Sequence, residues 1–167
     1  MRPRPKSTGR RDDHGAVAIE MAFVLPILTL FLTFPSIVLA FYCRQYSAAQ
    51  KAVHDATLYL STAPRVEVVT SGPDGNFAAL TLARKIVERE MAGIVPAGAT
   101  VDPAIFCTYQ VGGSPMTKPC TITYTKDVNH TLYQFDVSLG FSYTNPLTGS
   151  DTGLLISPYA PARYVGN

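Results

Sequence analysis

A long, unbroken apolar stretch near the N-terminal end dominates the pattern of hydrophobic and polar positions. Between residues 16 and 43 the only charged side chain is Glu20. About 25 residues of helix span roughly 37 Å, which is enough to cross a hydrocarbon core of roughly 30 Å. The stretch therefore predicts a transmembrane helix over residues 16–43, and a helix in the core of a soluble protein is the alternative.

The helical pattern continues beyond the apolar stretch. Residues 44–63 are rich in alanine, and neither glycine nor proline interrupts residues 40–63. We therefore expect one continuous helix that crosses the membrane, projects outward and ends before Pro64. A second amphipathic helix is predicted over residues 76–92, where apolar residues recur at helical spacing until Gly93.

The C-terminal part of the chain has a residue pattern typical of β-strands. β-Branched and aromatic residues with partial alternation predict three strands within residues 100–145, over 100–111, 120–128 and 131–144, with a turn between the last two. The element order predicts an α+β domain in which a roughly three-stranded antiparallel sheet packs on the helices. We expect the rest to be an extended tail that docks residues 154–156 on the sheet edge.

Charge predicts the direction of insertion. The first 15 residues contain five basic residues, which are Arg2, Arg4, Lys6, Arg10 and Arg11. Basic residues flanking a span stay on the cytoplasmic side, so residues 1–15 are predicted to be a cytoplasmic leader and residues 44–167 an extracytoplasmic domain. Phe41, Tyr42 and Tyr46 fit an interfacial aromatic belt. A secretory signal cut near Ala40 is the competing interpretation.

Glu20 is the most informative residue of the apolar stretch. An ionised carboxylate inside lipid costs several kcal/mol, and such residues are usually functional. Ala16 lies four residues before it, on the same helix face. Cleavage between Gly15 and Ala16 would create an α-ammonium on that face, which Glu20 of the same chain or of a neighbouring subunit would neutralise. The alternative is a solvated glutamate at headgroup level.

The N-terminal end of the apolar stretch resembles a prepilin cleavage site, with Gly15, Ala16 and Glu20 after a short basic leader. More narrowly, it resembles the start of TadE-like proteins, the pseudopilins of the tight-adherence (Flp pilus) apparatus. Further positions of that pattern are occupied by Ala18, Ala22 and Pro26. Met21 departs from it, because Flp-type sites favour an aromatic residue after the glutamate.

The resemblance implies a minor pilin or pseudopilin, cut after Gly15 by a prepilin peptidase, that acts in assembly of a Flp-type pilus or a related secretion machine. It implies a single-pass protein of the inner membrane with a periplasmic domain. The partners that it implies are the major pilin, sister pseudopilins, an assembly ATPase and inner-membrane platform proteins. An unprocessed membrane-anchored binding or sensor domain is the alternative.

Three cysteines add a further expectation. Cys107 and Cys120 flank a glycine-rich turn, and outside the cytoplasm such a pair is expected to form a disulfide. A metal pair is the rival, but the sequence has no Cys-x-x-Cys and its three histidines are scattered. Cys43, at the membrane boundary, is a free thiol, an intermolecular disulfide partner or simply an interfacial residue.

Composition and motifs point away from several function classes. The net charge is only +2, and no stripe of basic residues interleaved with aromatics predicts nucleic-acid binding. No nucleophile elbow, phosphate-binding glycine loop or His-Glu-x-x-His motif occurs. Glu88 and Glu90 fall on different faces of their helix, which argues against a paired acid–base site. We expect a protein that is not an enzyme and has no cofactor or metal.

Overall fold

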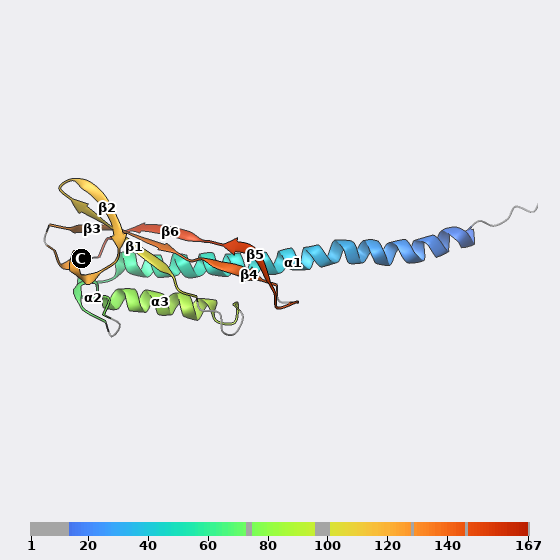
Figure 1. The fold of residues 1–167 in the computed structure, drawn as a ribbon, viewed down its shortest axis with the longest axis horizontal. Coiled ribbons are helices and arrows are strands. Elements are labelled where there is room, and N and C mark those ends of the chain that lie inside the picture. The colour runs from blue at the N-terminus through green and yellow to red at the C-terminus, as the bar shows by residue number, and fades with distance from the viewer. Residues whose placement is uncertain (1–13, 73–74, 96–100, 128, 146, 167) are drawn as a thin grey trace, which may run out of the picture. The chain divides into compact units, whose positions relative to one another are not determined.

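The structure is a computed structural model. It describes residues 14–72, 75–95, 101–127, 129–145 and 147–166, with side chains from residue 19 onward. Figure 1 shows the element order along the chain. The chain divides into two compact units, Met1–Leu39 and Ala40–Asn167. Most of the predicted leader, residues 1–13, lies outside the described residues.

Helix α1, His14–Thr62, includes both the predicted transmembrane segment and its alanine-rich continuation. It ends directly before the Ala63–Pro64 step, as the sequence predicted. Within the apolar part, the hydroxyl groups of Thr29, Thr33 and Ser36 each donate to the carbonyl four residues earlier, at 2.7 to 2.8 Å. These polar groups therefore find partners inside the helix and need no water.

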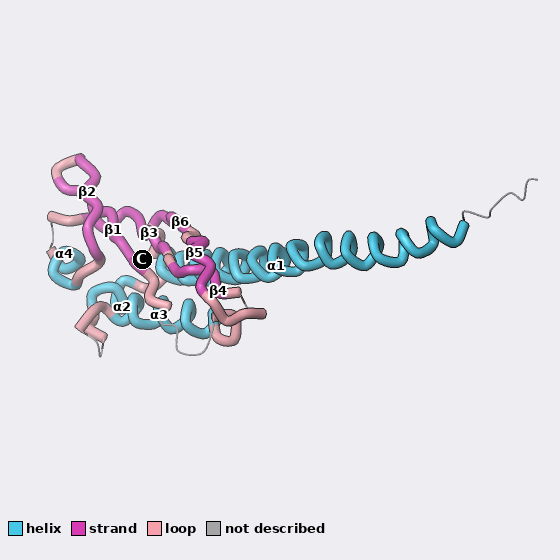
Figure 2. The backbone as a smooth tube through the Cα atoms, turned by 45° about the vertical axis from the view of Figure 1, so that its right-hand side comes forward, coloured by secondary structure: helices cyan, strands magenta, loops and turns pink. Residues whose placement is uncertain are grey.

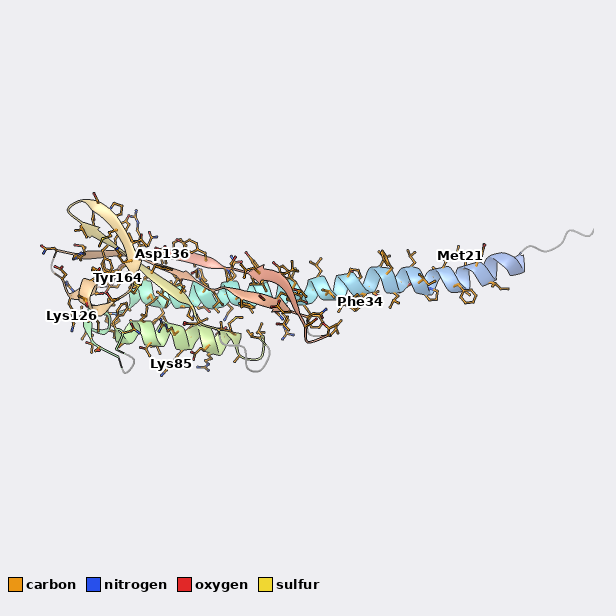
Figure 3. All side chains as sticks on the ribbon, viewed as in Figure 1. Met21, Phe34, Lys85, Lys126, Asp136 and Tyr164 are labelled. Atoms are coloured by element: carbon orange, nitrogen blue, oxygen red, sulfur yellow. A yellow bond between two sulfur atoms is a disulfide. The ribbon has the colours of Figure 1, made fainter. Side chains whose placement is uncertain are left out.

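Among the described residues that follow, three shorter helices form, which are α2 (Arg65–Val69), α3 (Ala78–Met91) and α4 (Ile122–Lys126). Helix α3 is the predicted second helix. It buries one face, formed by Ala79, Leu80, Ala83, Val87 and Met91, whereas Lys85 points away from the domain (Figure 3). Gly93 follows it with a φ of +76°, a conformation in which only glycine is unstrained, and this explains where the helix ends.

In the described part of the chain, six strands form two antiparallel sheets. Figure 2 shows these strands in magenta. The four-stranded sheet has the order β2-β1-β3-β6 and contains β1 (Ala104–Val111), β2 (Ser114–Pro119), β3 (Thr131–Ser138) and β6 (Tyr159–Arg163). The second sheet pairs β4 (Phe141–Thr144) with β5 (Asp151–Ile156). The α+β class with an N-terminal apolar helix is therefore confirmed.

The strand predictions need correction in detail. The segment predicted as a strand over 120–128 contains helix α4. The strand that follows the glycine turn and pairs with β1 is β2, which lies between the predicted strands 100–111 and 120–128. The predicted strand over 131–144 is divided at Leu139 and Gly140 into β3 and β4. The tail forms β5 and β6 rather than a single extended segment. Local alternation cannot reveal which segment finds a partner edge, because strand formation depends on tertiary neighbours.

The core of the second unit lies between α1, α3 and the sheet. From residue 45 onward α1 buries one face, formed by Gln45, Ala49, Ala52, Val53, Ala56, Thr57 and Leu60. The aromatic rings of Phe77 and Phe135 lie 6.4 Å apart in this core. Thr57 donates to the carbonyl of Ala160 at 3.3 Å, and the Val165 amide donates to the carbonyl of Ser61 at 2.9 Å. These bonds attach β6 and the C-terminal residues to α1.

Asp136 is a buried carboxylate that joins three strands. One of its oxygens accepts hydrogen bonds from the Gln134 amide at 2.7 Å and the Tyr159 hydroxyl at 2.6 Å, and the other accepts from Thr108 at 3.3 Å. Donation to this carboxylate raises the pKa of Tyr159. The network spans β1, β3 and β6, so it fixes the position of the C-terminal strand.

We expect Asp136→Ala to lower the free energy of unfolding by about 1–3 kcal/mol, because three donors lose a charged acceptor. Urea unfolding of the full chain in detergent measures this. The control is Asp102→Ala, since Asp102 has an 81% exposed side chain and lies 3.9 Å from the Arg84 guanidinium. An exposed pair of this kind contributes about 0–1 kcal/mol. An equal loss of unfolding free energy in the two variants would contradict the role of Asp136 as a stabilising acceptor.

Candidate functional site

The candidate site is the apolar half of α1 with its glutamate. Between residues 19 and 36 every side chain is exposed, including Phe23, Leu30 and Phe31 at 69%, 70% and 76%. The most apolar window of this helix has a mean hydropathy of 2.3, and none of it is buried. A helix that is apolar all round needs lipid or other apolar helices around it. Met21 and Phe34 illustrate this exposure in Figure 3.

Glu20 lies at the start of this segment and is exposed. Among the described residues no basic side chain forms an ion pair with it. The carboxylate is therefore available for a cation that comes from outside the described part of the chain. Such a cation would have a large effect, since it replaces the solvation that a carboxylate loses in lipid.

Gly15 and Ala16, the predicted processing site, lie in the first turn of α1, and the structure describes only their backbone. The helical conformation places Ala16 and Glu20 one turn apart on the same face. The backbone geometry on which the neutralisation argument depends is therefore present. Cleavage itself and the assembly role of Glu20 stay predictions.

Next along the chain, two residues of α1 contact strand β4. The ring of Tyr42 packs edge-on against Tyr143 of β4, with centroids 5.5 Å apart. The side-chain amide of the buried Gln45 donates to the carbonyl of Thr144 at 3.3 Å. Sequence reasoning missed the role of Gln45. A polar residue at the first position of the buried face was the only available signal, and its partner is far away in sequence.

Cys107 and Cys120 form a disulfide, as the sequence predicted. Their Cα atoms lie 4.9 Å apart, and both residues are buried. The β1–β2 hairpin brings them together through a two-residue turn at Gly112 and Gly113, whose φ values of +58° and +89° favour glycine. The bridge therefore fastens the start of α4 to the sheet. Cys43 is an exposed free cysteine.

No group of three or more His, Cys, Asp or Glu side chains in the described part of the chain could hold a metal ion. The hollow beside α2 is lined by residues that include Asp127 and His130. The Asp127 carboxylate accepts the Asn129 backbone amide at 2.9 Å. This bond, followed by the charge and hydrogen bond of His130, lowers the pKa of Asp127. The carboxylate serves the turn before β3.

These features define a class of protein. One N-terminal helix, compatible with single-pass membrane anchoring, continues into a disulfide-containing α+β domain. Residues 15–58 match the family model described as TadE-like protein. The chain therefore carries a TadE-like segment, and the resemblance predicted from the sequence is confirmed over those residues. No curated protein and no solved structure matches the chain.

Proposed function

We propose that the protein is a minor pilin or pseudopilin that acts in assembly of a Flp-type (tight-adherence) pilus or a related secretion machine. The observation that carries this proposal is the extent of the TadE-like match. It begins at Gly15, the predicted processing site, includes Glu20 and the apolar segment, and reaches Leu58 in the part of α1 that packs in the domain. Membrane anchor, assembly carboxylate and domain core are thus one continuous element.

This continuity supports a mechanism. Because the buried face of α1 begins at Gln45 and includes Leu60, the helix cannot leave the membrane without the domain. A machine that moves the apolar segment from lipid into a bundle of similar helices would therefore move the whole subunit. Glu20 would guide this transfer by pairing with the α-ammonium of its own processed chain or of a neighbour, since a neutralised pair loses less solvation than a lone carboxylate.

The proposal includes location and partners. The protein is held in the inner membrane with residues 1–15 in the cytoplasm and residues 44–167 outside it, until it is incorporated or primes assembly. The disulfide supports this orientation, since such bonds persist in oxidising compartments. The proposed partners are the prepilin peptidase, the major pilin, sister pseudopilins, the assembly ATPase and the platform proteins.

The decisive experiment is the intact mass of the membrane-extracted protein from cells with and without a prepilin peptidase. We expect a chain that starts at Ala16 only when the peptidase is present. A Gly15→Val chain is the control and should keep its leader in both strains, because the residue before the cut is then too large.

A leader retained in both strains would contradict processing and favour an unprocessed, membrane-anchored domain. A start near Phe41 would instead mean that the apolar segment is a secretory signal, and the pilin proposal would then be wrong. The two outcomes differ by the mass of the leader and the apolar segment together, so a single spectrum separates them.

A further inference from the structure

The β4–β5 hairpin carries apolar side chains that the domain does not cover. Leu147, Leu154 and Leu155 are 54%, 55% and 64% exposed. Successive residues of a strand point to opposite faces, so Leu154 and Leu155 leave both faces of the hairpin apolar. A folded domain rarely exposes neighbouring leucines without a use for them, which makes this hairpin a candidate interaction surface.

Contacts with α1 fix the place of the hairpin within its unit. Tyr143 packs on Tyr42, and the Thr144 carbonyl accepts the amide of Gln45. Tyr42 and Gln45 belong to the first turns of α1 in this unit, which begins at Ala40. The hairpin therefore lies beside the point at which the chain passes into its apolar segment.

The path of the chain shows which way the hairpin loop extends. In β6, Ala160 is bonded to Thr57, near the far end of α1. Strand β3 pairs antiparallel with β6 and so runs back along α1, and β4 then reaches Gln45. From Thr57 to Gln45 the helix covers about 18 Å. The described loop residues, Asn145 and 147–150, follow Thr144 at the Ala40 end of the unit.

The apolar segment ends, along the chain, shortly before the residues of α1 that the hairpin contacts. Its run of exposed apolar side chains ends near Leu39, and the first charged residue after it is the exposed Arg44. Gln45 lies about 8 Å along the helix from Ala40. The headgroup region on each side of a bilayer is about 5–8 Å thick. The residues of α1 that hold the hairpin therefore follow the apolar segment along the chain by about the thickness of one headgroup layer.

We propose that the β4–β5 hairpin is a second membrane contact, with its leucines inserted shallowly into the leaflet from which α1 emerges. This inference rests on the proposed membrane anchoring. The occupant is lipid, because the hairpin is tied to the residues at which the chain enters the bilayer.

The chemistry of the hairpin fits apolar insertion rather than charge attraction. Residues 141–156 contain neither lysine nor arginine. Their single acidic residue, Asp151, accepts the Gly153 amide at 2.8 Å. Backbone bonds close the loop, from the Asn145 amide to the Ser150 carbonyl at 3.0 Å and from the Gly149 amide to the Asn145 carbonyl at 2.7 Å. Paired backbone groups lower the cost of leaving water.

The test uses the full chain in phosphatidylcholine vesicles, with Cys43→Ser as background and one environment-sensitive fluorophore attached to an introduced cysteine. The label is placed in the hairpin by Leu154→Cys. The matched control is Val66→Cys on α2, because Val66 is 65% exposed at the opposite end of α1 from Gln45. Phe31→Cys reports on the apolar segment. We expect a lipid-borne quencher to quench the label at 154 several-fold more than that at 66.

Quenching at 154 should be insensitive to salt and to added phosphatidylglycerol, since apolar insertion needs no charge. If the label at position 31 is quenched but the label at position 154 is quenched no more than the label at position 66, the proposed hairpin contact is wrong. The proposed membrane anchoring then still holds. If the label at 31 is not quenched, the anchoring fails as well. Protection of position 154 only when another protein is added would assign the leucines to a protein partner and overturn the lipid assignment.

Discussion

Glu20→Ala is expected to abolish assembly of the protein into its pilus machine while the chain still inserts in the membrane. Insertion depends on the apolar segment, and removal of a charge makes insertion easier. Assembly, in the function proposed above, depends on pairing between this carboxylate and an α-ammonium. Loss of one partner leaves the other charge uncompensated in a medium of low dielectric constant, at a cost of about 3–5 kcal/mol. That cost corresponds to a loss of more than 100-fold in the association constant.

Membrane insertion and assembly are both measured by crosslinking in whole cells, followed by fractionation of membranes and sheared pili. Glu20→Asp is the matched control, since it keeps the charge on a shorter side chain and should retain part of the assembly. Glu20→Gln keeps the size without the charge and should behave like the alanine variant. Normal assembly of either uncharged variant would show that the ion pair has no part in the process.

Removal of the Cys107–Cys120 disulfide is expected to lower the free energy of unfolding of the domain by about 3 kcal/mol. The cysteines are 13 residues apart in sequence, and the bridge limits the freedom of the unfolded chain between them. The double variant Cys107→Ala, Cys120→Ala is preferable to serine, because serine would place a hydroxyl group at two buried positions. A loss of this size corresponds to a fall in Tm of roughly 10 °C.

Thermal unfolding of the full chain in detergent, with and without reductant, measures the effect. Reductant should lower the Tm of the unmodified chain and leave that of the double variant unchanged. The control is Cys43→Ser, because Cys43 is exposed and outside the bridge. Its effect should be within about 0.5 kcal/mol. A reductant effect that persists in the double variant would have to come from another group.

The features that sequence reasoning anticipated depend on local patterns. The length and hydropathy of the apolar stretch, together with Pro64, predicted the course and end of α1. Helical spacing and Gly93 predicted α3, and the glycine turn between Cys107 and Cys120 predicted the bridge. Each of these signals lies within a few residues of the structure that it specifies, so no knowledge of distant neighbours was needed.

The features that were missed depend on pairing between distant segments. Residues 122–126 alternate threonine with larger side chains and look like a strand, yet they form α4, because β2 already pairs with the edge of β1. The tail contains Pro161, which has no backbone N–H to donate, yet it lies in β6. As a member of an edge strand it is tolerated opposite Asp136. Glu20 could be identified from sequence, whereas the contact of Gln45 with Thr144 required the fold.

Helix α1 contains both the apolar segment and part of the domain core, and this has a mechanical consequence. A force applied along the axis of α1 during extraction from the membrane would act on its buried face, from Gln45 to Leu60, in shear. The contacts of that face would then be strained together, rather than broken one after another as in peeling. The disulfide joins β1 to the residue after β2 and lies outside this path. We therefore expect the domain to withstand traction on its helix even when the disulfide is reduced.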